Sequence, residues 1–136
     1  MLARGNNYKI YRDDLLYPEL SFEISGVLFQ IFKHLGSGHR ERYYQKAVKV
    51  GLEKKGIKYK EQFYVPIRFE GELIGKYYLD FLIEDKIVLE LKRGKYIPAN
   101  VINQTKQYLE SLEMKLGLIA CFTHTSVHVK RIINHY

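Results

Sequence analysis

The apolar residues of this 136-residue chain repeat with two different periods, and the period changes at Gly56. Before that point, residues 18–35 place apolar side chains three or four positions apart, which is the spacing of one helical face. Pro18 suits the first turn of such a helix and Gly36 suits its end. A second helix is predicted over residues 38–55, with Gly56 as its stop.

After Gly56 the sequence becomes rich in β-branched and aromatic residues, which is typical of strands. The predicted elements are strands over 57–69, 73–84 and 86–93, a helix over 98–114, a strand over 116–123, and a strand or short helix over 127–134. Residues 116–123 are almost entirely apolar, as expected of a strand that is covered on both faces.

This order of elements predicts an α/β fold with a mixed central β-sheet flanked by helices, in the order αα-βββ-α-β-β/α. A chain of 136 residues divided in two would give two undersized cores, so one domain is expected over residues 17–136. Residues 1–16 mix charged and polar side chains and are expected to form a loosely attached N-terminal arm.

The sequence contains no run close to the ~18 to 20 apolar residues that a membrane span requires. Its N-terminus also lacks the apolar run of a secretory signal. We therefore expect a cytoplasmic protein with no membrane partner. Its single cysteine, Cys121, excludes an internal disulfide and lies in the apolar run LGLIACF, so we expect a buried thiol.

The net charge of +7 is concentrated in one block. Residues 38–60 contain eight basic and two acidic side chains, a net charge of +6. Such a block suits a polyanionic partner, although a solvated helix face rich in lysine explains the charge equally well.

Alternation along the strands predicted on either side of Asp85 sorts their side chains onto two faces. One face is apolar or aromatic and is expected to be core: Tyr77, Leu79, Phe81, Ile83, Ile87, Leu89 and Leu91. The other face carries Tyr78, Asp80, Leu82, Val88, Glu90 and Lys92. A turn centred on Asp85 makes Asp80 and Glu90 opposite partners, whereas a two-residue turn would put them on different faces. The first register places the apolar residues of both strands on the same face, which favours it.

Two carboxylates on opposed positions of one face have Cβ atoms roughly 4.5–5.5 Å apart and repel each other. Lys92 could neutralise them on a solvated face. A divalent cation is the other candidate, because Mg²⁺ favours one or two carboxylates together with water and phosphate oxygens. Leu82 and Val88 share the face, so it is not simply solvated.

These residues resemble a known pattern. Asp80 followed by Glu90-Leu91-Lys92 resembles the D…(D/E)-x-K signature of the PD-(D/E)XK nuclease superfamily. Residues 38–44 read G-x-x-E-x-x-Y, the pattern of the GxxExxY protein family within that superfamily. Gln104 and Tyr108 form Q-x-x-x-Y, which is similar to a motif of RecB-like exonuclease relatives. The resemblance covers residues 18–134 and implies a restriction-endonuclease-like core.

The sequence departs from that pattern in two places. Leu79 stands where the superfamily has the proline of its PD motif, and His39 and Arg40 occupy positions that are usually apolar in G-x-x-E-x-x-Y relatives. The second departure affects how Glu41 would approach a metal.

The resemblance implies a role for each matching residue. Asp80, Glu90, the backbone carbonyl of Leu91 and Glu41 would bind Mg²⁺ or Mn²⁺. Lys92 would position the attacking water or stabilise charge on the phosphate. The implied roles of Gln104 and Tyr108 are to orient the site or to contact nucleic acid. Expected nucleic-acid contacts are Arg40, Arg42, Lys46, Arg93 and Lys95.

Structural explanations compete with several functional readings of these motifs. Glu41 falls in a first helical turn, where the helix dipole favours an acid in any case. Gln104 could cap or bridge backbone groups, Tyr44 of the G-x-x-E-x-x-Y pattern could simply pack, and Arg93 and Lys95 could be ordinary surface charges.

The leading hypothesis is therefore a divalent-metal-dependent nuclease that hydrolyses phosphodiester bonds in nucleic acid, with DNA as the expected substrate. The alternative is a catalytically silent module that keeps the nuclease fold and binds nucleic acid or recruits a partner. A metal enzyme of another class and a structural oligomer are further alternatives. Paired cuts by so small a chain would be explained by a homodimer.

Overall fold

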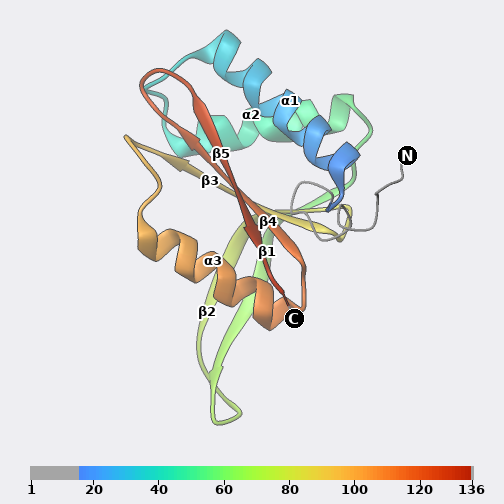
Figure 1. Ribbon diagram of the computed structural model, residues 1–136, viewed down its shortest axis with the longest axis vertical. Helices are drawn as coiled ribbons and strands as arrows, with labels where there is room; N and C mark the ends of the chain where they lie inside the picture. The colour runs from blue at the N-terminus through green and yellow to red at the C-terminus, as the bar shows by residue number, and fades with distance from the viewer. Residues whose placement is uncertain (1–15, 136) are drawn as a thin grey trace, which may run out of the picture.

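The structure, a computed structural model, describes residues 16–135 (Figure 1). In this part of the chain, one twisted sheet lies between a pair of helices and a single helix on the opposite side. The elements are α1 (Pro18–Leu35), α2 (Glu41–Lys54), β1 (Tyr59–Phe69), β2 (Glu72–Ile83), β3 (Ile87–Arg93), α3 (Ala99–Leu112), β4 (Leu116–Phe122) and β5 (Val127–Ile133).

The five strands described are ordered β1-β2-β3-β4-β5, so neighbours in sequence are also neighbours in the sheet. β3 and β4 are parallel and are joined by α3, as parallel neighbours require a crossover connection. The other pairs are antiparallel. The predicted mixed sheet flanked by helices is confirmed. The last element, which the sequence left open, is the strand β5.

One core layer lies between the sheet and the pair α1 and α2. Leu28 of α1 and Val48 of α2 are fully buried there, against strand residues such as Leu89. The helices approach closely because Gly51 has no side chain: a Cβ at this position would lie 2.4 Å from Val27 Cγ1. The glycine therefore allows the helix crossing that completes this layer.

The second core layer lies between the sheet and α3. Leu109 of α3 packs there with buried residues of the strands, including Leu82, Val88 and Ile119. Leu82 and Val88 lie on the face that also carries the two acids, so the prediction that this face is not simply solvated is confirmed. Cys121 is also fully buried, as predicted.

The structure corrects the predicted side of the sheet at two positions of β2. Leu79 is buried in the α3 layer with Tyr77 packed against it, whereas Phe81 and Ile83 belong to the α1–α2 layer. The physical reason is that β2 pairs with β3 only from Phe81 to Ile83. The residues of β2 that precede Phe81 pair with β1 alone. Gln62 interrupts β1 at the same level with a left-handed φ of 51°.

The loop between α1 and α2 ends later than predicted, so that α2 begins at Glu41 rather than at residue 38. Gly38 has a φ of 88° and Arg40 is extended, which delays the first helical turn. The Tyr44 hydroxyl donates a hydrogen bond of 2.7 Å to the Gly36 carbonyl and so holds the loop closed.

Residues 1–15 of the predicted N-terminal arm lie outside the described residues. Leu16, the last residue of that arm, packs against the α1–α2 layer. Among the helices within residues 16–135, none has the length and apolar character needed to cross a membrane.

Candidate metal-binding active site

The hairpin of β2 and β3 has the predicted register about Asp85. Its paired residues are Phe81 with Leu89, Leu82 with Val88, and Ile83 with Ile87. The ladder ends at the first of these pairs. Continuing the register makes Asp80 and Glu90 opposite neighbours, and they lie where the two strands separate.

Each of the two acids bonds to the backbone of the other strand at this point. The Asp80 N–H donates to Glu90 Oε1 at 2.8 Å, and the Leu91 N–H donates to Asp80 Oδ2 at 2.7 Å. Hydrogen bonds to ionised acceptors are shorter and stronger than neutral ones. The carboxylates therefore replace the missing ladder bonds and are held side by side between the strands.

Glu90 has a further partner that sequence reasoning missed. The Tyr77 hydroxyl donates to Glu90 Oε2 at 2.8 Å, and the Tyr77 ring stacks on that of Tyr108 with centroids 4.4 Å apart and an interplanar angle of 17°. Tyr108 thus reaches the site through Tyr77. Strict alternation along β2 had placed Tyr77 in the opposite core layer, so no sequence signal indicated this contact.

Burial governs the electrostatics of the pair. Burial and the neighbouring Asp80 charge raise the pKa of Glu90 from 4.5 to about 7. Burial also raises the pKa of Asp80, although the Leu91 N–H and the Lys92 charge act against that rise. For Tyr77, burial and the Glu90 charge raise the pKa of the hydroxyl, which therefore stays protonated as a donor. Raised values of this kind are common at functional sites.

Lys92 and Glu41 approach the pair from different elements. Lys92 follows Glu90 by two residues on β3, is half-buried, and opposes the rise in the pKa of both acids. Glu41 begins α2 and is exposed. After burial, its negative charge adds to the rise in the pKa of Asp80, so Glu41 lies within electrostatic range.

Glu41 does not complete a cluster of metal ligands with the two acids. In the stretch from residue 16 to residue 135, no three His, Cys, Asp or Glu side chains are close enough to hold one ion. The predicted direct ligation by Glu41 therefore has no support in this geometry. Because α2 starts at Glu41 itself, the side chain lies at the exposed rim of the site.

Two glutamines differ from what the sequence suggests. Gln62, which no motif identified, hydrogen-bonds with Asp80 and lowers the pKa that burial raises. Its left-handed backbone is uncommon for a non-glycine residue, so the sequence carried no signal for it. Gln104 lies one helical turn before Tyr108 on α3 and is exposed. The structure thus connects only the tyrosine of the Q-x-x-x-Y pair to the acids.

The basic residues predicted to contact nucleic acid are all exposed, and they divide between two regions. They are Arg40, Arg42 and Lys46 at and near the start of α2, and Arg93 and Lys95 at the end of β3. Arg42 lies over the Tyr43 ring, 5.1 Å from its centroid.

The donor set of the two acids fits a hard divalent cation. Each carboxylate oxygen has two lone pairs, and the hydrogen bonds described above leave acceptor capacity on both Asp80 and Glu90. Oxygen ligands are the preferred ligands of Mg²⁺ and Mn²⁺. A cation between the two acids would also remove the repulsion that raises the pKa of Glu90.

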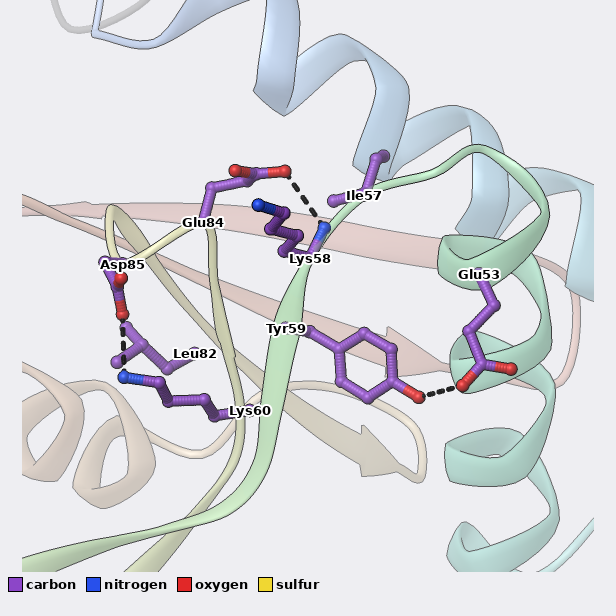
Figure 2. A pocket seen from close by; sticks show the side chains of 8 residues that line it. All are labelled: Glu53, Ile57, Lys58, Tyr59, Lys60, Leu82, Glu84 and Asp85. Carbon is purple, nitrogen blue, oxygen red and sulfur yellow. Dashed lines mark hydrogen bonds and ion pairs between the residues drawn. The ribbon is translucent and has the colours of Figure 1, made fainter.

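A hollow of about 750 Å³ lies at the turn end of the same hairpin, away from the acids (Figure 2). Several of its lining side chains contact one another: Lys60 Nζ lies 3.1 Å from Asp85 Oδ1, and the Tyr59 hydroxyl donates to Glu53. None of the predicted site residues lines this hollow. The chemistry is therefore expected where the strands separate.

Comparison with known proteins agrees with this fold. The family model described as the PD-(D/E)XK nuclease superfamily matches residues 18–132. The fold is similar to that in the crystal structure of SSO0001, with a TM-score of 0.54 and 15% sequence identity over 94% of this chain and 62% of that chain. This chain thus spans less than two thirds of SSO0001, and the likeness concerns the fold alone. The comparison with curated proteins found no match. Because the family match covers most of the sequence, the chain belongs to the PD-(D/E)XK nuclease superfamily.

Proposed function

We propose that this protein is a nuclease that hydrolyses phosphodiester bonds in DNA and uses Mg²⁺ or Mn²⁺ as its cofactor. The observation that carries the proposal is the Asp80–Glu90 pair. Glu90 is buried and Asp80 is half-buried, the pKa values of both are raised, and Lys92 lies beside them. Membership of the nuclease superfamily supports the same reaction class.

In this proposal, Asp80, Glu90 and the backbone carbonyl of Leu91 hold the cation. When bound, a divalent cation supplies a more acidic water and neutralises charge on the attacked phosphate. Glu41 contributes negative charge at the rim of the site without ligating the ion directly. Such a charge can attract the cation or accept a hydrogen bond from a water near Asp80.

The remaining roles belong to groups around the acids. The Lys92 ammonium binds a phosphate oxygen and stabilises the charge that develops there. The Tyr77 hydroxyl fixes the orientation of Glu90, and the stacked Tyr108 ring keeps Tyr77 in place. Tyr77 and Tyr108 are therefore positioning residues.

The proposed substrate is supported by the block of net charge +6 over residues 38–60, to which α2 belongs. Arg40, Arg42 and Lys46 are proposed to contact backbone phosphates on one side of the site, with Arg93 and Lys95 on the other.

A finer family placement is also proposed: the G-x-x-E-x-x-Y and Q-x-x-x-Y patterns favour the GxxExxY family and the RecB-like branch. We further propose a homodimer, which would allow paired cuts and would be detected by light scattering.

The test is cleavage of plasmid and linear DNA with Mg²⁺ and with EDTA. Wild-type protein should cut only with the metal, and Asp80→Asn and Glu90→Gln should abolish cutting. Asp85→Asn is the matched control, because it changes an exposed acid in the turn of the same hairpin. Cutting that survives either site substitution would remove the assignment. Salt-sensitive DNA binding without cutting under any metal would favour the silent binding module instead.

A further inference from the structure

The hairpin of β1 and β2 extends beyond α3 and the rest of the sheet (Figure 1). Its two faces differ. One face is covered by the α3 layer and buries Val65 and Leu79, with Phe63 and Tyr77 packed beside them. The side chains that alternate with these form the outer hairpin face: Gln62, Tyr64, Pro66 and Arg68 of β1, and Lys76 and Tyr78 of β2.

An aromatic pair lies at the centre of the outer hairpin face. Tyr64 and Tyr78 are direct partners across the strands, their ring centroids are 5.8 Å apart, and each residue is 43% exposed. Lys76 Nζ lies 5.9 Å from the centroid of the Tyr78 ring. Such a cross-strand pair stabilises the hairpin, and its exposed rings also offer a surface on which a planar ligand can stack.

This surface is continuous with the proposed active site. Tyr78 precedes Asp80 by two residues on β2, and Gln62, which hydrogen-bonds with Asp80, precedes Tyr64 by two residues on β1. Two residues of a strand advance about 6.7 Å. That step is comparable to the separation of successive phosphates in an extended single strand of nucleic acid.

The side chains of this surface indicate which class of ligand it binds. Exposed aromatic rings and interspersed cations are the features with which proteins bind single strands, through base stacking and phosphate contacts. Before Asp80, the outer hairpin face carries the cations Arg68 and Lys76 and no carboxylate. An added β-strand from another protein is disfavoured at this edge of the sheet, because Pro66 of β1 lacks a backbone N–H.

We propose that the outer hairpin face binds single-stranded nucleic acid and leads it to Asp80, with bases stacked on Tyr64 and Tyr78 and a phosphate at Lys76. This inference rests on the proposed nuclease function and deepens it, because it names single strands or single-stranded arms as the substrate class.

The test measures binding of a labelled oligothymidylate and of a duplex in EDTA, on the Asp80→Asn background, so that no cleavage is required. Replacing both tyrosines by leucine (Tyr64→Leu with Tyr78→Leu) should weaken single-strand binding by about 30-fold or more and leave duplex binding unchanged. Phe29→Leu is the matched control, since it changes an aromatic ring of α1 that is 55% exposed.

A second variant separates stacking from folding. Replacing both tyrosines by phenylalanine keeps the rings and should keep the affinity. Single-strand binding that is unchanged in the leucine variant, or lost equally in the leucine and phenylalanine variants, would overturn the proposal. Failure of the nuclease assignment would appear separately, as the absence of metal-dependent cutting by wild-type protein.

Discussion

The backbone N–H of Asp80 donates a 2.8 Å hydrogen bond to the carboxylate of Glu90, ten residues further along the chain. The Asp80 carboxylate in turn accepts from the N–H of Leu91. The two acids thus perform two tasks at once, because they close the hairpin where its ladder ends and present their remaining lone pairs between the strands. Changes that affect the acids should therefore alter both stability and metal binding.

The first prediction concerns the pH dependence of stability without metal. Burial and the Asp80 charge raise the pKa of Glu90 from 4.5 to about 7, so between these values the folded protein holds a proton that the unfolded chain has released. The free energy of unfolding should therefore fall as pH rises through this window, by on the order of 1–3 kcal/mol. Thermal unfolding in EDTA at several pH values measures the effect.

Glu90→Gln supplies the control for that measurement. The amide cannot titrate, so the decline across this window should be much smaller in the variant than in wild type. Identical pH profiles for the two proteins would show that Glu90 does not carry a proton in the folded state.

The second prediction concerns the tyrosine that contacts Glu90. Tyr77→Phe removes the donated hydrogen bond but keeps the ring stacked on Tyr108. Loss of such an outer contact typically costs about 10- to 100-fold in metal affinity or activity, and cleavage should fall by that factor. Tyr59→Phe is the matched control, because its hydroxyl donates to Glu53 away from the site. Equal losses in the two variants would exclude a specific role for Tyr77.

The third prediction separates charge stabilisation from metal binding. Lys92→Met should lower the rate of cleavage by about 100-fold or more, because the developing phosphate charge loses the ammonium group that stabilises it. Binding of Mn²⁺ should persist or tighten, since a positive charge beside both acids is removed. Lys86→Met, in the turn of the same hairpin, should change neither quantity. Loss of Mn²⁺ binding in the Lys92 variant would contradict this assignment.

The sequence could predict the two acids and their pairing, because the period of a strand is two and a shift of one residue would have exposed the apolar face. It could not predict the Tyr77 contact, because that contact depends on the separation of β2 from β3 at the residues that precede Phe81. The sequence also could not predict the position of Glu41, since a loop held by the Tyr44 hydroxyl determines where α2 begins. The elements follow from local patterns, whereas these contacts follow from tertiary packing.

The fourth prediction tests the helix pair that supports the site. Gly51→Ala places a Cβ against Val27 and should destabilise the protein by about 1–3 kcal/mol. Gly26→Ala is the matched control: its Cβ would meet nothing within 4 Å, and alanine is the better helix former by about 1 kcal/mol. Urea unfolding should therefore shift the two variants in opposite directions. A neutral Gly51→Ala would show that the helices do not cross this closely.

Titration calorimetry with Mn²⁺ tests the metal centre most directly. Wild-type protein and Asp85→Asn should bind the ion with the same affinity, whereas Asp80→Asn and Glu90→Gln should each lose binding while remaining folded. A wild-type protein that binds no Mn²⁺ at millimolar concentration, or one whose binding survives both site substitutions, would contradict the proposal that these two acids share a cation.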